Sequence, residues 1–372
     1  MLVGVPSEIK NNEYRVGLVP SSVRELVANG HRVVVQRGAG AKIGFDNTAY
    51  EHVGATILDT AQEIFNVADM IVKVKEPQLS ECKMLRENQV LFTYLHLAPD
   101  PEQTKLLLES GCVAIAYETV TDKNGGLPLL APMSEVAGRM AIQAGANSLE
   151  IVNGGSGILL GGVPGVAPAK VVVLGGGVVG TNSVRMAMGM GAQVVVIDKA
   201  LERLYQLDLQ FGSKICTIYS TTDSIEHHVH TADLVIGAVL VPGGSAPRLV
   251  TREMLKHMRA GSVVVDVSID QGGCFETSRP TTHQDPTYVE EGVVHYCVSN
   301  MPGAVPRTST FALNNATLPF TLALANFGYK QAMRLDPHLM NGLNVCKGKL
   351  THKAVASALQ KEYVPAEIII NQ

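Results

Sequence analysis

The sequence lacks the features that mark several classes of protein. Its charges nearly cancel, with 30 Lys and Arg against 34 Asp and Glu, so nothing attracts it to nucleic acid or to an anionic membrane, and small molecules are the expected partners. The N-terminal stretch MLVGVPSEIK has no basic region, apolar core or cleavage site, which argues against export. The six cysteines contain no C-x-x-C pair. This usage is typical of reduced thiols, and we expect a cytoplasmic protein.

A membrane-spanning helix is not expected either. Residues 151–169 carry no charge, but they contain six glycines and two prolines, which favours a mobile loop over a spanning helix. The composition, with 46% hydrophobic, 17% charged and only 5% aromatic residues, is that of an ordinary globular protein. A chain of 372 residues is long enough for two domains, or for three.

The sequence does contain two series of alternating strand-like and helix-like segments. The first series has apolar strands at residues 2–6, 31–36, 69–77, 89–97 and 112–120, separated in part by helices at 21–30 and 101–111. The second series has strands at residues 170–175, 192–198, 232–240 and 261–270. Nearly continuous apolar strands that alternate with helices are typical of a parallel sheet covered on both faces.

Two longer helical patterns, at residues 131–151 and 308–334, follow the two series. We therefore predict an α/β protein with two doubly wound parallel-sheet (Rossmann-like) domains joined by two long helices. The first domain would comprise residues 1–130 plus 310–372 and the second residues 131–309. Ser21 or Ser22 is the expected cap of the first helix, Ser134 is the expected cap of the first long helix, and Pro319 is the expected kink in the second.

The strongest single motif lies in KVVVLGGGVVGTNSVRMAMGMGAQVVVID, residues 170–198. Gly175, Gly177 and Gly180 have the G-x-G-x-x-G spacing between a strand and a helix, and Asp198 ends the next strand. The first glycine allows a tight turn, the second lets the backbone approach a pyrophosphate, and the third permits close helix packing. The helix N-terminus attracts the anion. The motif therefore predicts a dinucleotide site.

The charges around Asp198 bear on the choice of nicotinamide cofactor. A carboxylate at this position favours NAD, because the 2′-phosphate of NADP would lie against it. Lys199 and Arg203 follow closely and leave NADP open.

Three residues of the first series are expected at one edge of its sheet. Arg15 follows the first strand, Lys75 ends the run IVKVK, and His96 ends the run VLFTYLH. Ligands of open α/β sheets bind beyond the carboxyl ends of the strands, so two cations and an imidazole there suit a small carboxylate beside a proton-transfer group. The alternatives are solvated surface cations and a satisfied structural histidine. Lys73, two residues before Lys75, is a rival ligand.

Acidic residues and histidines of the second series allow two interpretations each. Asp270 closes the run GSVVVDVSID at the sheet edge, where a carboxylate could orient water or take a proton, although a turn cap is the alternative. Asp266 is expected to be structural. The histidines of IEHHVH, residues 225–230, are predicted to lie on a solvated helix face, and no metal site is predicted, because no cysteine or well-spaced acid accompanies them.

Longer stretches match a known family. They include GVPSEIKNNEYRVGLVP, VKVKEP, TYLHLAPD, APMSEVAGRMA, LLGGVPGVAPAKVVVLGGGVVG, VDVSIDQGGCFETSRPTTH and VSNMPGAVPRTST. Through them the sequence resembles the alanine dehydrogenase family over essentially its whole length. The resemblance implies an oxidoreductase that reversibly deaminates L-alanine to pyruvate and ammonia with NAD. It also implies a homo-oligomer, usually a hexamer.

The resemblance further implies roles for single residues. Arg15 and Lys75 would hold the substrate, and His96 and Asp270 would form the catalytic pair. The residues expected to line the cofactor site are Ser134, Gly175, Gly177, Val178, Val179, Gly180, Asp198, Arg203, Ser220, Val239, Leu240, Val267, Ser268, Ile269, Asp270, Arg279, Val298, Ser299, Asn300 and Met301.

Other functions are compatible with parts of this pattern. The NAD-binding component of a transhydrogenase has a similar two-domain plan but needs no small-carboxylate pocket. A saccharopine dehydrogenase would need a larger pocket, and a non-catalytic NAD sensor would bind the cofactor without turnover. The combination of Arg15, Lys75, His96 and Asp270 favours the amino-acid enzyme.

Overall fold

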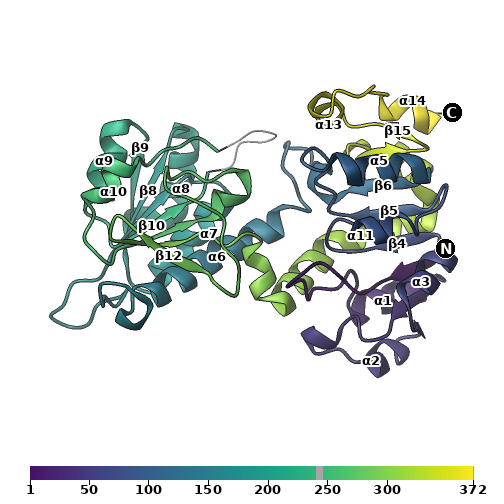
Figure 1. Ribbon diagram of the computed structural model, residues 1–372, viewed down its shortest axis with the longest axis horizontal. Helices are drawn as coiled ribbons and strands as arrows, with labels where there is room; N and C mark the ends of the chain where they lie inside the picture. The colour runs from purple at the N-terminus through teal and green to yellow at the C-terminus, as the bar shows by residue number, and fades with distance from the viewer. Residues whose placement is uncertain (240–245, 372) are drawn as a thin grey trace. The chain divides into compact units, whose positions relative to one another are not determined.

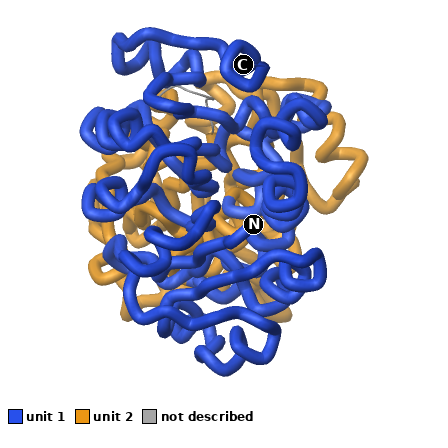
Figure 2. Tube along the Cα trace, turned by 90° about the vertical axis from the view of Figure 1, so that its right-hand side faces the viewer, with its two compact units in different colours: residues 1–133, 305–372 blue, residues 134–304 orange. Residues whose placement is uncertain are grey.

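The computed structural model describes residues 1–239 and 246–371 (Figure 1). The chain forms two units, one of residues 1–133 and 305–372 and one of residues 134–304 (Figure 2). Each unit is built on one mostly parallel sheet with helices, which confirms the predicted α/β class with two Rossmann-like sheets. Within the described ranges, no helix combines the length and the apolar character that crossing a membrane requires.

The sheet of the first unit has eight strands in the order β15-β14-β6-β5-β4-β1-β2-β3. Strands β1 to β6 pair in parallel, whereas β14 pairs antiparallel with both β6 and β15. The strands are β1 (Leu2–Val5), β2 (Arg32–Gln36), β3 (Thr56–Leu58), β4 (Met70–Val72), β5 (Val90–Thr93), β6 (Val113–Ala116), β14 (Leu343–Cys346) and β15 (Lys349–Leu350). Every residue of β4, β5 and β6 is buried, as expected for a parallel sheet covered on both faces.

The helices of this unit connect the strands and cover the sheet. They are α1 (Pro20–Ala28), α2 (Asn47–Glu51), α3 (Ala61–Val67), α4 (Leu79–Cys82), α5 (Pro101–Ser110), α11 (Pro306–Leu335), α12 (Pro337–Met340), α13 (Lys353–Ala358) and α14 (Ala366–Asn371), with 3₁₀ turns η1 (Ala41–Ile43) and η2 (Tyr117–Thr119).

The second unit has a seven-stranded sheet in the order β12-β13-β11-β10-β7-β8-β9, in which only the β12–β13 pairing is antiparallel. Its strands are β7 (Lys170–Leu174), β8 (Gln193–Asp198), β9 (Ile215–Tyr219), β10 (Leu234–Gly237), β11 (Val263–Asp266), β12 (Thr287–Glu290) and β13 (Val293–Tyr296). Its helices are α6 (Ala131–Ser148), which begins in the first unit, α7 (Val178–Gly189), α8 (Leu201–Phe211), α9 (Thr222–His230) and α10 (Arg252–Lys256), with 3₁₀ turns η3 (Ile151–Asn153), η4 (Gly212–Lys214), η5 (Val267–Gln271) and η6 (Met301–Ala304).

Three details of the predicted helices are wrong. Helix α1 has Val19 at its N-cap, without a side-chain cap, and Pro20 in its first turn, where the missing N–H costs nothing. Ser134 lies inside the first turn of α6 instead of before it. The backbone of α11 leaves helical geometry at Gly328, whose φ of 70° suits glycine, and not at Pro319.

Helix α11 returns the C-terminal part of the chain to the first unit. Its residue Asn314 is buried, accepts the N–H of Val19 at 2.8 Å through Oδ1, and donates to the carbonyl of Gly17 at 3.1 Å through Nδ2. One amide side chain thus pairs with the backbone of the segment that leads from β1 into α1. Helix α11 therefore packs against the first unit at this contact.

Candidate active site

Both sheets have a switch point, where neighbouring strands are followed by connections that leave in opposite directions. In the first unit it lies between β1 and β4, since β2 and β3 extend the sheet on one side and β5 and β6 on the other. The segment after β1 runs against the end of β4: a Cβ added at Gly17 would lie 2.3 Å from the carbonyl oxygen of Val72. Topology therefore brings the segments after β1, β4 and β5 to one edge, the position in which open α/β sheets bind ligands.

Arg15 is the most enclosed of the predicted ligands. Its side chain is 2% exposed, and its guanidinium donates twice to the Glu13 carboxylate, from Nε to Oε1 at 2.7 Å and from Nη2 to Oε2 at 2.6 Å. Nη1 lies 3.1 Å from the sulfur of Met133. Glu13 and Arg15, with residues 7–12 and the loop at 38–42, line a cavity of about 320 Å³. Arg15 is therefore a buried cation at a cavity wall, not a solvated surface charge.

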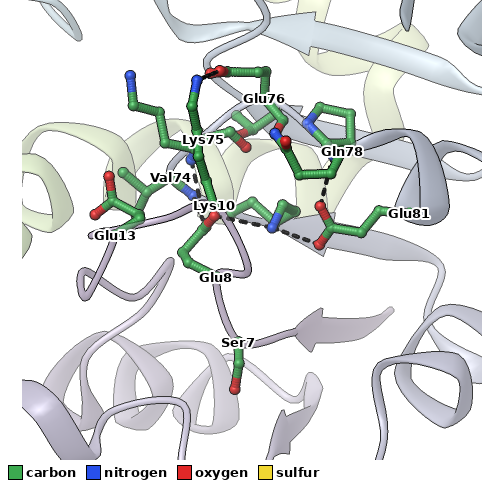
Figure 3. A network of polar contacts seen from close by, with 12 residues as sticks. Ser7, Glu8, Lys10, Glu13, Val74, Lys75, Glu76, Gln78 and Glu81 are labelled. Carbon is green, nitrogen blue, oxygen red and sulfur yellow. Dashed lines mark hydrogen bonds and ion pairs between the residues drawn. The ribbon is translucent and has the colours of Figure 1, made fainter. Parts of the chain in front are cut away.

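Lys73 and Lys75 have different environments. The Lys73 ammonium is completely buried and pairs with Glu8 at 3.0 Å and Glu81 at 2.8 Å, so two carboxylates hold it inside the unit. Figure 3 labels these two carboxylates. Lys75 is only partly buried. Burial lowers the pKa of Lys75, and the charge of Arg15 lowers it further, against the opposing effect of Glu76. Lys73, the alternative substrate ligand, is thus part of a structural ion pair, and Lys75 is the lysine beside Arg15.

His96 does not end a strand, contrary to the prediction. Strand β5 stops at Thr93, and His96 adopts a left-handed backbone with a φ of 49°. The Glu118 carboxylate accepts the N–H of His96 at 2.7 Å and that of Leu95 at 3.1 Å, which stabilises this turn. Such a conformation is unfavourable for a residue with a Cβ unless its surroundings enforce it. The turn leaves the side chain of His96 46% exposed.

Two further groups orient the imidazole of His96. The ring of Tyr94 stacks on it with centroids 5.8 Å apart, and Nδ1 lies 3.7 Å from Oε2 of Glu76. Glu76 also pairs with Lys10 (Figure 3). Burial by itself lowers the pKa of His96, but the interaction with Glu76 and the negative charge of Glu118 outweigh it, so the pKa is raised. The imidazole is thus an accessible proton carrier that is biased toward its charged form.

The glycine motif of the second unit lies at that unit's switch point, between β7 and β10. Gly175 has a φ of 99°, and a Cβ there would come within 2.7 Å of the Ala238 carbonyl oxygen at the end of β10. A Cβ at Gly180 would lie 1.8 Å from the carbonyl oxygen of Gly175. At Gly177, the N-cap of α7, a Cβ would meet no atom within 4 Å. Two of the glycines are thus required by the fold itself, and the third faces open space at a helix N-terminus.

Asp198 and Arg203 fasten this turn. Asp198 accepts the N–H of Gly176 at 2.6 Å and that of Ala200 at 2.8 Å. Arg203 donates from Nε to the Gly176 carbonyl at 2.6 Å and from its Nη atoms to Gln206 and Thr181. An ionised carboxylate has about four acceptor positions, so Asp198 keeps capacity for hydroxyl donors. The guanidinium of Arg203 is directed at its own loop and helix, which weakens the argument for a 2′-phosphate site.

Asp270 also departs from its predicted position. Strand β11 ends at Asp266, and Asp270 lies in the 3₁₀ turn η5, with an exposed side chain. Asp266 is completely buried and accepts the N–H groups of Ser268 and Cys274 and the hydroxyl of Ser278, which fits the predicted structural role. These bonds hold η5 at the carboxyl edge of the second sheet.

The other residues expected at the cofactor lie after the strands of the second sheet or next to its glycine turn. Ser220 follows β9 and donates its N–H to the Asp198 carbonyl, Val239 follows β10 and accepts from the hydroxyl of Ser268 at 2.7 Å, and Arg279 stacks 3.8 Å over the ring of Tyr288. Val267, Ile269, Val298, Ser299, Asn300 and Met301 follow β11 and β13, Val178 and Val179 open α7, and Ser134 lies in α6. Leu240 is outside the described residues.

The second unit fits a dinucleotide on observations of its own. The N-terminus of α7 has an exposed glycine with open space at its Cα, so a pyrophosphate could reach the first N–H groups of the helix. A carboxylate stands at the end of the adjacent strand β8, the position that accepts ribose hydroxyls in such folds. Among residues 1–239 and 246–371, no group of three or more His, Cys, Asp or Glu side chains is arranged to hold a metal ion.

The sequence interpretation missed the acidic partners of the first unit. Each predicted site residue of this unit has an acidic neighbour that the sequence analysis did not single out. Arg15 pairs with Glu13, Lys75 feels the charge of Glu76, and His96 donates its backbone N–H to Glu118. Glu13 and Glu76 stand within two residues of a cation that was singled out, so local charge pairing was the available signal. Glu118 is 22 residues from His96, and the sequence carries no signal for that contact.

Comparisons with known proteins agree along the whole chain. The family models described as "Alanine dehydrogenase/PNT, N-terminal domain" and "Alanine dehydrogenase/PNT, C-terminal domain" match residues 4–137 and 141–353. The curated alanine dehydrogenase of Halomonas elongata is 59% identical over 370 residues, with 100% of both chains covered. A solved L-alanine dehydrogenase is 53% identical with a TM-score of 0.94, covering 97% of this chain and 99% of its own. A solved transhydrogenase from Sinorhizobium meliloti is 25% identical with a TM-score of 0.81, covering 95% and 100%.

Proposed function

The chain belongs to the alanine dehydrogenase/PNT family, and from this premise we propose that it catalyses the reversible, NAD-dependent oxidative deamination of L-alanine to pyruvate and ammonia. The observation that carries this proposal is the cluster at the edge of the first sheet, where a buried arginine and a partly buried lysine lie beside an accessible histidine. A unit that only bound a dinucleotide would have no need to bury an arginine at a cavity wall, because dehydrating a charge is costly.

Substrate binding is assigned to Arg15 and Lys75. A guanidinium offers a planar pair of donors to a carboxylate, and an ammonium adds a point charge, so together they suit the carboxylate of an α-amino acid. The cavity of about 320 Å³ beside Arg15 has room for a small amino acid. In this assignment the first unit is the substrate domain and the second unit, with the glycine turn, is the cofactor domain.

Proton transfer is assigned to His96, with Asp270 as its partner at the cofactor side. The ammonium group of alanine first loses a proton to solvent, and removal of a hydride from Cα then leaves an iminium ion, to which water adds. His96 in its neutral form takes a proton from that water and, in its charged form, returns one to the amine. Asp270, as an exposed carboxylate, orients the water or stabilises the cationic intermediate. The C–N bond breaks as the new hydroxyl group gives its proton to neutral His96, so ammonia leaves and pyruvate remains.

NAD supplies the hydride acceptor when it is bound. The residues that would hold it are the glycine turn with the first N–H groups of α7 for the pyrophosphate and Asp198 for the ribose. The chain's own contribution is to orient these groups before binding: the Gly175 turn, the Gly180 packing and the bonds from Asp198 and Arg203 fix the loop.

Location and assembly are proposals of a different kind. We propose a cytoplasmic enzyme, supported by six cysteines that are all free thiols, of which only Cys216 is exposed. We also propose a homo-oligomer, with a hexamer as the expected state. This proposal is supported by the family and by no contact within the chain. Light scattering of the purified full-length chain measures it directly.

The test of the proposed function is NAD reduction by L-alanine, followed through NADH absorbance, with NADP in parallel. The expected result is turnover with NAD and little or none with NADP. His96→Ala should reduce kcat by about 10²–10⁴-fold, the usual contribution of a general acid–base, while NADH binding persists. Tight NADH binding without turnover of alanine, glycine or serine would instead indicate a transhydrogenase-like component or a sensor.

A further inference from the structure

Glu13 and Arg15 form a buried ion pair of the first unit that faces a cavity. Their side chains are 1% and 2% exposed, and the two carboxylate oxygens meet Nε and Nη2 of the guanidinium at 2.7 and 2.6 Å. Oε1 also accepts the backbone N–H of Arg15 at 3.1 Å. Both residues line the cavity of about 320 Å³. One carboxylate thus fixes the backbone and one edge of the arginine's head group together.

We propose that Glu13 is a positioning residue for substrate binding, which fixes the plane and rotamer of the Arg15 guanidinium for the carboxylate of the amino acid. This inference rests on the proposed function, because it assigns Arg15 to the substrate. It goes further by naming the group that acts through Arg15.

The geometry of the ion pair supports this role. A guanidinium carries five N–H donors in one plane, and the bidentate Glu13 carboxylate engages two of them, on Nε and Nη2. The substrate therefore approaches an arginine whose plane and rotamer are already set, which reduces the ordering that binding would otherwise require.

The electrostatics also require a carboxylate at this position. Arg15 and Lys75 are close enough for the charge of Arg15 to lower the pKa of Lys75, while Glu13 opposes that effect. Burial raises the pKa of Glu13 itself, but its bonds to Arg15 outweigh this and lower it, so Glu13 remains ionised. With Glu13 charged, the buried guanidinium of Arg15 is paired, as a charge removed from water requires.

The test uses the full-length chain with Glu13→Gln, which keeps the size and removes the charge. Initial rates with varied L-alanine give KM and kcat, NADH titration gives the cofactor Kd, and thermal unfolding gives Tm. We expect KM to rise at least about tenfold, equivalent to about 1.4 kcal/mol of binding free energy, with kcat within about threefold and the NADH Kd unchanged. Glu13→Asp keeps the charge on a shorter side chain and should raise KM for L-alanine by less than Glu13→Gln does. If the glutamine variant does not fold, the KM of Glu13→Asp is compared with that of the wild type instead.

The matched control is Glu81→Gln. It also removes a buried carboxylate from an ion pair of the same unit, but that pair involves Lys73 and not Arg15. A second control is the double variant that combines Glu13→Gln with Arg15→Lys, in which no guanidinium remains to be held. Its KM should differ from that of Arg15→Lys alone by less than about twofold. The proposal is overturned if Glu13→Gln leaves KM within about twofold, if Glu81→Gln raises KM equally, or if the effect persists in Arg15→Lys.

Calorimetry with pyruvate in the presence of NADH separates this inference from the proposed function, because it reports carboxylate binding without turnover. A wild-type chain that binds pyruvate but does not oxidise L-alanine refutes the proposed function, and the ratio of pyruvate affinities between wild type and Glu13→Gln then decides the role of Glu13. A wild-type chain that neither oxidises L-alanine nor binds pyruvate refutes both.

Discussion

Replacing Glu76 with glutamine should lower the pKa of His96 and shift the pH dependence of alanine oxidation. Oε2 of Glu76 lies 3.7 Å from Nδ1 of His96 and has no hydrogen-bond partner within the described part of the chain, while the same carboxylate also pairs with Lys10 and acts on Lys75. The interaction raises the pKa of His96 in the folded enzyme. His96 therefore stays protonated to higher pH than a free histidine. Its neutral, proton-accepting form appears only as the pH rises through this raised pKa.

The size of the shift follows from Coulomb's law with solvent screening. Two unit charges 3.7 Å apart interact by about 1.1 kcal/mol at the dielectric constant of water, which corresponds to about 0.8 of a pKa unit. The imidazole is 46% exposed, so the aqueous limit is the appropriate one, and exposed pairs are often worth less. We expect the acidic limb of kcat/KM for L-alanine oxidation to move to lower pH by about 0.5–1 unit in Glu76→Gln.

The assay is kcat/KM against pH at saturating NAD, together with NMR titration of labelled imidazoles, in which His96→Gln assigns the resonance. Glu109→Gln serves as the matched control, because it removes a carboxylate of the same unit whose partner is the exposed Lys105. An acidic limb that stays in place, or that moves to higher pH, would refute the coupling of Glu76 to His96. An equal shift in Glu109→Gln would show that net charge, and not this contact, sets the pKa.

Three further predictions concern neighbouring residues with different expected roles. Lys73→Met leaves two buried carboxylates without a cation and should lower the free energy of unfolding by about 3–5 kcal/mol in a denaturant titration. Lys75→Met should instead mainly raise KM for L-alanine. Gly177→Ala should keep the wild-type Tm and weaken NADH binding, because the added Cβ enters open space beside α7. Gly180→Ala should also lower Tm, because its Cβ would overlap a carbonyl oxygen. Equal effects of the two substitutions on Tm would contradict this prediction. Asp198→Asn should raise KM for NAD and reduce the discrimination against NADP, measured as the ratio of the two kcat/KM values.

The cofactor motif could be predicted from the sequence because its chemistry is local. Gly175, Gly177, Gly180 and Asp198 belong to one strand–helix–strand segment, and the backbone geometry of such a segment depends on which positions lack a Cβ. Arg203 shows where this reasoning ends. Its position close to Asp198 in the sequence left open that it binds the 2′-phosphate of NADP. Its hydrogen bonds to Gly176, Gln206 and Thr181 in the folded chain weaken that alternative.

The first unit shows how far pattern reasoning reaches for a site built from several segments. Burial periodicity located β1, β2, β4, β5 and β6 but missed β3, β14 and β15, and the predicted strand ends placed Arg15, Lys75 and His96 at one edge. Periodicity could not separate Lys73 from Lys75, since both lie near the end of the same strand. The difference arises from Glu8 and Glu81, which reach Lys73 from other elements. The predicted strand also ran past Thr93, because the apolar pattern continues through residues that turn.

The sequence by itself determined the α/β class, the two sheets, the cofactor motif and the family, because each depends on local patterns that survive without knowledge of tertiary contacts. The tertiary structure alone decided the electrostatic state of the site. Glu118, far along the chain, fixes the left-handed turn at His96, while Glu13 pairs with Arg15 and Glu76 raises the pKa of His96. Charges interact through space over a few ångströms, and only the fold decides which of them come that close.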